Sequence, residues 1–255
     1  MEFFDSHAHY NDEKFEQDRD ELIKKIYDEG VTRIINAGYS LESSKEAIKI
    51  AKDYDFMNVI VGISPNDIDE FKKEDLQEIE NLAVDNKVVA IGEIGLDYYW
   101  NKQNKDLQKK VFISQIQIAN KLNLPIVIHT REAIFDTLEI LKNNNFNKKG
   151  VFHCCPLNVD LVREGLKLGF YISFAGPITF KNSKNSDEII KMVPLDKILI
   201  ETDCPYLTPE PLRGKRNDSR NVKYMAQKIA NVKGISLEEV SEATYNNAKK
   251  IFQIK

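Results

Sequence analysis

The stretch Val88-Val89-Ala90-Ile91-Gly92-Glu93-Ile94 contains one charged residue, Glu93, in an otherwise apolar run. A strand with one face in water alternates apolar and polar residues, whereas a strand covered on both faces is almost continuously apolar. This stretch therefore predicts a buried strand of a parallel sheet that has helices on its outer side.

Similar short runs occur along the whole chain, separated by loops or by segments with apolar residues at helical spacing. One such stripe comprises Phe15, Leu22 and Ile26. Two helices are expected after the last strand, the second over residues 237–252 with Ser236 as its N-cap and Glu239 three residues later. The predicted strands cover residues 3–5, 31–37, 57–63, 88–94, 125–129, 150–153, 170–174 and 197–202.

The order of these segments decides the fold class. Eight predicted strands in 255 residues match the size of an α/β (β/α)8 TIM barrel. The alternative is an open doubly wound sheet, but no Gly-x-Gly-x-x-Gly motif follows the first strand. Because we find no repeat, low-complexity segment or linker, we predict a single domain over residues 1–255, a TIM barrel with extra C-terminal helices.

Composition excludes several classes of protein. With 36 Lys and Arg against 40 Asp and Glu, the net charge is −4, so any binding of phosphate must be local. Apolar runs such as 59–63 are far shorter than the roughly 20 residues of a membrane helix, and no secretory signal follows Met1. The three cysteines are odd in number and two are adjacent, which indicates no disulfide framework and a reducing cytoplasm.

All four histidines and two acids are predicted at the ends of strands. The active site of a (β/α)8 barrel lies at the carboxyl ends of its strands, so these side chains share one rim. A lone histidine at a strand end is more often a hydrogen-bonded structural residue, but the convergence of all four with two carboxylates favours a metal site. The residues are His7, His9, Glu93, His129, His153 and Asp203.

Imidazole and carboxylate groups are the ligands of Zn, Mn, Fe, Co or Ni, and partly of Mg. Six ligands exceed the needs of one tetrahedral ion, so we predict two divalent metal ions with Glu93 shared between them. Such a pair would activate a water, and Asp203 is then either the base for that water or a ligand only.

Other polar residues are expected around this site. Glu201 and Asp5 would accept hydrogen bonds from ligand histidines, or are buried structural carboxylates. Cys154 is predicted to point away from the ligands, while Cys155 and Cys204 are candidates for tuning the choice of metal. The aromatic run 98–100 would either stack on bases or close the mouth of the barrel.

The loop after the last strand is basic. Loops at this place in a barrel are frequent phosphate sites, and arginine offers bidentate geometry to phosphate. We therefore predict that Arg213, Lys215 and Arg216 bind substrate, with Arg131 and Lys181 as weaker candidates; a solvated charge cluster is the alternative.

Five motifs, in the same order along the chain, resemble the TatD family of metal-dependent deoxyribonucleases in the amidohydrolase-like barrel group. They are Phe4-Asp5-Ser6-His7-Ala8-His9, Gly92-Glu93-Ile94-Gly95-Leu96-Asp97-Tyr98-Tyr99, Ile128-His129-Thr130-Arg131, Phe152-His153-Cys154 and Glu201-Thr202-Asp203-Cys204-Pro205-Tyr206-Leu207. The resemblance implies that His7, His9, Glu93 and Asp203 hold a first metal. It also implies that Glu93, His129 and His153 hold a second one.

The resemblance further implies a two-metal hydrolase that cleaves phosphodiester bonds of DNA, exonucleolytically on single-stranded ends, with Mg, Mn or Zn. The chain departs from the family at Ser64-Pro65-Asn66, where a His-Pro pair is common, and at Cys155-Pro156-Leu157, where Phe-Ser-Gly is common. Neither departure removes a predicted ligand.

Two other functions fit the same residues. A barrel hydrolase of other esters, amides or lactones would use the same ligands, although many of those bridge their metals with a modified lysine where this chain has Glu93. A non-catalytic nucleic-acid binder would use the basic loop alone, which the net charge and the full ligand set disfavour. We expect no membrane partner and see no evidence of an obligate protein partner.

Overall fold

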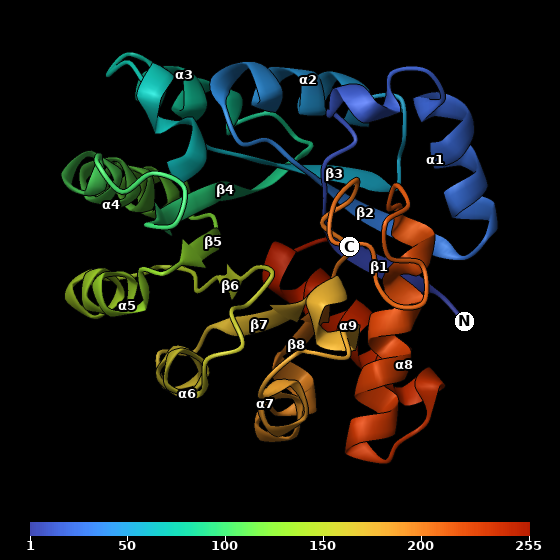
Figure 1. Cartoon of the computed structure of the whole chain (residues 1–255). Coiled ribbons are helices and arrows are strands. Elements are labelled where there is room, and N and C mark those ends of the chain that lie inside the picture. Colours follow the sequence, from blue (N-terminus) through green and yellow to red (C-terminus); the bar gives the residue numbers. More distant parts are fainter.

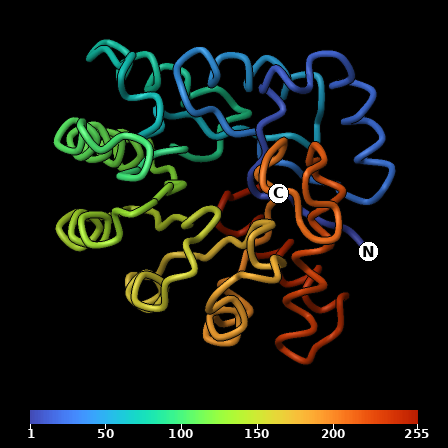
Figure 2. The backbone as a smooth tube through the Cα atoms, viewed as in Figure 1, coloured from blue at the N-terminus to red at the C-terminus, as the bar shows by residue number.

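The computed structural model describes residues 1–255 and contains one sheet of eight parallel strands in chain order. Figure 1 and the tube view in Figure 2 show the helices ranged around the outside of this sheet. The strands are β1 (Phe3–Ala8), β2 (Val31–Ala37), β3 (Met57–Val61), β4 (Val88–Asp97), β5 (Ile126–Arg131), β6 (Val151–Phe152), β7 (Tyr171–Phe174) and β8 (Ile198–Ile200). This arrangement confirms the predicted (β/α)8 barrel.

Hydrogen bonds also join the two ends of the sheet, β1 and the segment that includes and follows β8. The backbone N–H of Asp203, just after β8, donates to the carbonyl of His7 in β1 at 2.9 Å. The Ser6 hydroxyl donates to the Ile200 carbonyl, also at 2.9 Å. These contacts bring the first and last strands together, so residues distant in sequence share one rim.

Nine α-helices surround or close the barrel: α1 (Arg19–Asp28), α2 (Leu41–Ala51), α3 (Asp75–Leu82), α4 (Lys105–Leu122), α5 (Ile134–Asn143), α6 (Val159–Lys167), α7 (Ser186–Met192), α8 (Val222–Lys233) and α9 (Leu237–Phe252). The predicted stripe of Phe15, Leu22 and Ile26 is not one helix. Phe15 ends a short 3-10 helix, Glu13–Phe15, whereas Leu22 and Ile26 belong to α1.

Two apolar cores flank the strands. The larger lies between the strands and the surrounding helices. The smaller joins the alternate side chains of the strands, among them Phe4, Ile60 and Leu199, to Ile251 and Phe252 of α9. Helix α9 therefore covers the end of the barrel opposite the carboxyl ends of the strands, which we call the lower end. In Figure 1 it lies near the middle of the ring of strands, beside β8.

The start of α9 agrees with its predicted capping box. The Ser236 hydroxyl accepts from the Glu239 N–H at 3.1 Å, and Glu239 Oε2 accepts from the Ser236 N–H at 2.8 Å. Further along α9, the Asn247 amide donates to the carbonyls of Leu195 and Ile198, which fixes the helix to the amino end of β8.

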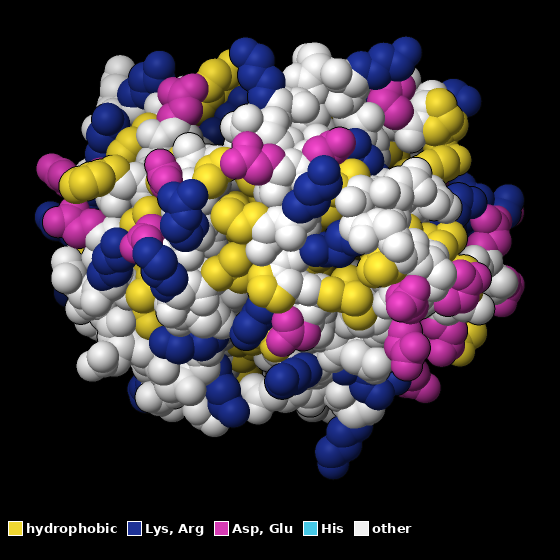
Figure 3. Space-filling model, turned by 90° about the horizontal axis from the view of Figure 1, so that it is seen from below, with side chains coloured by type: hydrophobic (Ala, Val, Ile, Leu, Met, Phe, Trp, Pro, Cys, Tyr) yellow, Lys and Arg dark blue, Asp and Glu magenta, His cyan; other side chains and the backbone are white.

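The surface near α7 and α8 carries basic and acidic side chains side by side, and no histidine is visible on it (Figure 3). None of the helices combines the length and the apolar composition that a membrane span requires.

Candidate metal centre

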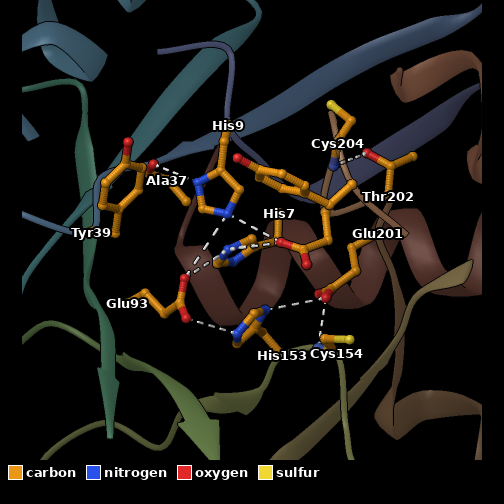
Figure 4. A network of polar contacts seen from close by, with 12 residues as sticks. His7, His9, Ala37, Tyr39, Glu93, His153, Cys154, Glu201, Thr202 and Cys204 are labelled. Atoms are coloured by element: carbon orange, nitrogen blue, oxygen red, sulfur yellow. Dashed lines mark hydrogen bonds and ion pairs between the residues drawn. The ribbon is translucent and has the colours of Figure 1, made fainter. Parts of the chain in front are cut away.

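The four histidines and two acids come together at the carboxyl ends of the strands. Figure 4 shows His7, His9 and His153 arranged around Glu93. The nitrogen and oxygen atoms of these residues form three overlapping groups, each compact enough to hold an ion. The groups are His7, His9 and Glu93; Glu93, His129 and His153; and His7, His153 and Asp203.

Glu93 lies at the centre and directs one oxygen to each pair of histidines. Its Oε2 is 3.5 Å from His7 Nε2 and 4.0 Å from His9 Nε2. Its Oε1 is 2.9 Å from His129 Nδ1 and 3.3 Å from His153 Nε2. The carboxylate is thus placed between two sets of donors.

Asp203 completes the set around His7 and His9. Its Oδ1 lies 3.1 Å from His9 Nε2 and 3.8 Å from His7 Nε2. Donors at about 2.1 Å from a tetrahedral ion are about 3.4 Å from one another. The spacing between the donors of this site is therefore of the size that a shared cation requires.

An unsatisfied imidazole provides a second test of whether a cation fits. His7 is fully buried, and neither of its ring nitrogens has a hydrogen-bond partner. Buried polar groups are rarely left unpaired in native proteins. A cation held by His7 Nε2 would satisfy one of these nitrogens, so the donor set fits a metal.

Other groups hold the remaining rings in place. His9 Nδ1 is 3.0 Å from the Ala37 carbonyl, and His129 Nε2 is 2.9 Å from Asp97 Oδ2. Glu201 Oε1 forms an ion pair with His153 Nδ1 at 3.3 Å and accepts the Cys154 N–H at 2.6 Å. Partners of this kind fix the tautomer and the orientation of a metal-binding histidine.

Asp97 is absent from the predicted set. The signal was present in the sequence, because Asp97 follows Glu93 by four residues and the strand period of two places both on one side. It was missed because the predicted strand ends at residue 94, whereas β4 continues to Asp97.

Asp5 does not contact a ligand ring, so it fits the second of its two predicted roles, that of a buried structural carboxylate. Its carboxylate accepts from the N–H of Thr202 at 2.9 Å and from the Thr202 hydroxyl at 2.5 Å, with the His7 backbone N–H 3.4 Å away. Burial raises the pKa of Asp5 to about 7. The residue therefore ties the backbone before Asp203 to β1.

The charges of the centre support one another. Burial opposes ionisation of Glu93, but the charge of His153 and the close approach of His129, His153 and His7 hold its pKa well below the usual range. Burial likewise opposes ionisation of Asp203, and contact with His9 lowers its pKa to about 2. Neighbouring carboxylates raise the pKa values of three histidines despite burial: Asp203 and Glu93 act on His9, Asp97 and Glu93 on His129, and Glu93 and Glu201 on His153.

The centre lies in a pocket of about 1090 Å³. Arg131 and Trp100 line one part of its wall, and apolar residues such as Ile178 and Phe180 line another. Ser64 and Asn66, where the chain departs from the family pattern, also line the pocket. Next to them is Asp67, whose pKa is raised to about 6 by burial.

Two cysteine side chains also line this pocket. Cys154 was predicted to point away from the ligands, but it faces the pocket together with Cys155. Strand β6 ends at Phe152, and Cys154 has a positive φ of 37°, so the strand alternation does not extend to it. Cys204 is buried outside the pocket lining.

The predicted substrate-binding cations lie in different places. Arg131 lines the pocket. Arg213 stacks on the ring of Phe180 at 3.9 Å, so it lies against the pocket wall. Arg216 donates to Asp18 at 2.8 Å, and neither it nor Lys215 lines the pocket.

The chain is similar to known proteins over nearly its whole length. The family described as TatD related DNase matches residues 4–253. The metal-dependent hydrolase YabD of Bacillus subtilis is 45% identical, over 98% of this chain and 99% of its own. The metal-dependent hydrolase YcfH of Escherichia coli is 35% identical, over 100% of this chain and 97% of its own.

Solved structures show the same fold. YjjV, a TatD homologue from Escherichia coli, superposes with a TM-score of 0.95 at 23% identity, over 99% of this chain and 98% of its own. A TatD family hydrolase from Entamoeba histolytica has a TM-score of 0.88 at 26% identity, with 98% of each chain covered.

Proposed function

This chain belongs to the TatD family of metal-dependent hydrolases, and we propose that it cleaves phosphodiester bonds of DNA, working exonucleolytically on single-stranded ends. The observation that carries the proposal is the position of Glu93, whose two oxygens each face a different pair of histidines. A site of this kind suits an in-line displacement at phosphorus, in which both the attacking and the leaving oxygen need stabilisation.

Two divalent ions, Mg, Mn or Zn, would supply Lewis acidity toward a phosphoryl oxygen and a water of lowered pKa. His7, His9, Asp203 and Glu93 Oε2 would hold the first. His129, His153 and Glu93 Oε1 would hold the second.

Asp203 has one oxygen for each of two roles. Its Oδ1 faces His9 and His7, so this oxygen would be the ligand. Its Oδ2 has no hydrogen-bond partner in the protein, and Asp203 lines the pocket, so Oδ2 would accept the proton of the attacking water. The water oxygen bonds to phosphorus, the bond to the leaving nucleotide oxygen breaks, and a proton returns to that oxygen.

Arg131 and Arg213 are the cations we assign to substrate phosphates, because one lines the pocket and the other stacks on its wall. Guanidinium groups bind phosphate in bidentate geometry. Lys215 and Arg216 lie outside the lining and would meet only a strand that extends past it. The predicted metal ligands are mostly buried within the pocket. We therefore favour single-stranded DNA over duplex DNA as the substrate, because the backbone of a single strand can enter a pocket.

The test is cleavage of end-labelled single-stranded oligodeoxynucleotides by the purified protein. Cleavage should stop with a chelator and return with Mn, Mg or Zn, and a circular single strand should resist. The Glu93→Gln variant should lose at least about 1000-fold in kcat, consistent with loss of a group that stabilises the transition state. Glu46, a half-buried residue on α2 that forms an ion pair with Lys49, offers a control, and Glu46→Gln should behave like the parent protein.

Parallel assays with a lactone, a carboxylic ester and a phosphotriester address the other hydrolase reactions. Metal-dependent turnover of one of these substrates, together with inert DNA, would reject the nuclease and assign the site to that substrate class. Cleavage of DNA that persists in excess chelator would reject the proposed mechanism.

A further inference from the structure

Two exposed aromatic side chains lie at the rim of the metal pocket. Trp100 is 68% exposed and Tyr99 is 42% exposed, whereas the neighbouring Tyr98 is buried. Trp100 lines the pocket together with His129 and Arg131, and it shares with Tyr99 an adjoining hollow of about 360 Å³. Large aromatic surface at this position is not used for packing the barrel.

The aromatic turn is fixed by a carboxylate of the metal centre. Asp97 Oδ1 accepts the backbone N–H groups of Tyr99 and Trp100, each at 2.9 Å, while Oδ2 pairs with His129. The Tyr98 hydroxyl anchors the turn by donating to Asp136 at 2.6 Å. The position of Trp100 is thereby set relative to a predicted metal ligand.

Arg131 adds a flat cation to this surface. It follows His129 by two residues in β5 and pairs in register with Asp97 of β4. Its guanidinium lies 3.9 Å from the ring centre of Tyr99 and 5.4 Å from that of Trp100. It forms no ion pair with any carboxylate of the protein, so its charge is free for a ligand.

We propose that Trp100 and Arg131 form a subsite for the base of the nucleotide next to the scissile phosphate in single-stranded DNA, an assignment that rests on the proposed function. Bases stack on aromatic rings and on guanidinium planes whatever their sequence. Because Arg131 also lines the pocket, its guanidinium would reach the phosphate of the same nucleotide. A base inside a duplex is already stacked on its neighbours, so this subsite selects unpaired strands.

Trp100 is the sole tryptophan of the chain, which makes its fluorescence a direct probe of stacking. The full-length protein, kept in chelator to prevent cleavage, is titrated with a ten-nucleotide oligodeoxyadenylate and with a ten-unit abasic strand of the same charge. We expect oligodeoxyadenylate to quench the fluorescence and to bind roughly 10-fold more tightly than the abasic strand. Equal affinity and equal quenching would overturn the subsite, because attraction between charges alone would then explain binding.

Variants distinguish loss of base stacking from a general disturbance of the fold. Their binding is measured by the fluorescence anisotropy of a labelled strand. Trp100→Ala should weaken binding of oligodeoxyadenylate about 10-fold and leave abasic binding unchanged, and Trp100→Phe should restore most of the loss. Phe135, on α5 and 79% exposed, is the matched control because it does not line the pocket; Phe135→Ala should bind like the parent protein. Equal losses for both strands in Trp100→Ala would overturn the proposal.

These binding measurements do not depend on catalysis, so the two proposals can fail separately. Base-dependent quenching in a protein that cleaves no DNA would reject the nuclease activity and support the subsite. Metal-dependent cleavage with base-independent binding would reject the subsite alone.

Discussion

Single residues around the metal centre determine how precisely its ligands are held. Asp97 is the clearest case, because one carboxylate contacts the ring of His129 and also fixes the backbone of Tyr99 and Trp100. Contact with His129 and the backbone N–H groups lowers the pKa of Asp97 even though burial opposes this. Asp97 therefore remains an acceptor, which leaves Nδ1 of His129 free to face Glu93.

The Asp97→Asn variant tests this positioning role. Its amide can present an N–H to His129 Nε2 and so remove the preference for the tautomer that ligates through Nδ1. We expect metal affinity to fall about 10- to 100-fold, the range seen when the partner of a ligand histidine is lost. Isothermal titration calorimetry with Mn measures this affinity. The control is Asp69→Asn, because Asp69 is exposed and lines the hollow beside Tyr99 and Trp100. Equal metal affinities in the two variants would contradict the positioning role of Asp97.

Gly95 provides a prediction about backbone packing beside the centre. A Cβ at this position would lie 1.9 Å from the His129 carbonyl oxygen, and φ is +144°, which side chains rarely allow. Gly95→Ala should therefore lower the free energy of unfolding by more than about 3 kcal/mol or prevent folding. Gly214 also has a positive φ but has open space around it, so Gly214→Ala should cost about 1 kcal/mol. Equal urea midpoints for the two variants would show that the clash is relieved.

At the scale of helices and strands, the sequence predicts which elements exist more reliably than where they end. Every predicted strand is present, because an apolar run records burial directly. Strand β1 reaches Ala8 and β4 reaches Asp97, beyond the predicted ends, because pairing with the neighbouring strand extends them across polar residues. Such pairing depends on distant segments and leaves no periodic pattern in the local sequence.

The same limit applies to the candidate site. The six predicted ligands could be placed because each lies on or beside a strand, and the barrel brings strand ends together. The side-chain contacts of Asp5 and Cys154 could not be predicted, because they depend on irregular backbone: the turn around Asp203, with φ of 55°, and the turn after β6. Whether the six residues bind metal stays a prediction that the experiments above test.

The capping box of α9 gives a prediction at this scale. Ser236→Ala removes the acceptor for the Glu239 N–H and should lower stability by about 1 kcal/mol. Ser114, within α4, makes no side-chain hydrogen bond, so Ser114→Ala should be neutral or slightly stabilising because alanine favours the helix. Chemical denaturation of both variants measures the difference. A loss in Ser114→Ala as large as in Ser236→Ala would indicate a general effect of removing a hydroxyl.

The whole molecule divides its tasks between the two ends of the barrel. Helix α9 closes the lower end with apolar side chains and with the hydrogen bonds that the Asn247 side chain donates to Leu195 and Ile198, at the start of β8. The upper end carries acids and imidazoles from β1, β4, β5, β6 and the segment after β8. A cation at the upper end would therefore bind β1, the β4–β5–β6 part of the sheet and the segment after β8 at one point, so its binding should stabilise the entire fold.

Removal of the metal tests whether the cation stabilises the fold, and the size of this stabilisation should depend on pH. At a free metal concentration 100 times the Kd, binding adds about 2.7 kcal/mol, which for a domain of this size raises Tm by about 5–10 °C. His9, His129 and His153 have raised pKa values in the metal-free protein, so protons compete with the cation as pH falls. These raised values stabilise the metal-free fold below the unfolded pKa of about 6.5, and that stabilisation is lost as pH rises through the folded pKa.

At low pH, protons compete with the cation and also stabilise the metal-free fold, so both effects reduce the rise in Tm caused by Mn or Zn. This rise should therefore be large at pH 8 and small at pH 5.5. The pKa values of Glu93 and Asp203 are lowered, so these acids remain ionised throughout this range and do not reverse the trend. Scanning calorimetry with chelator and with metal at each pH measures the difference. In Glu93→Gln the metal-dependent rise should disappear at pH 8. A rise of equal size at both pH values would mean that the cation binds away from the histidines.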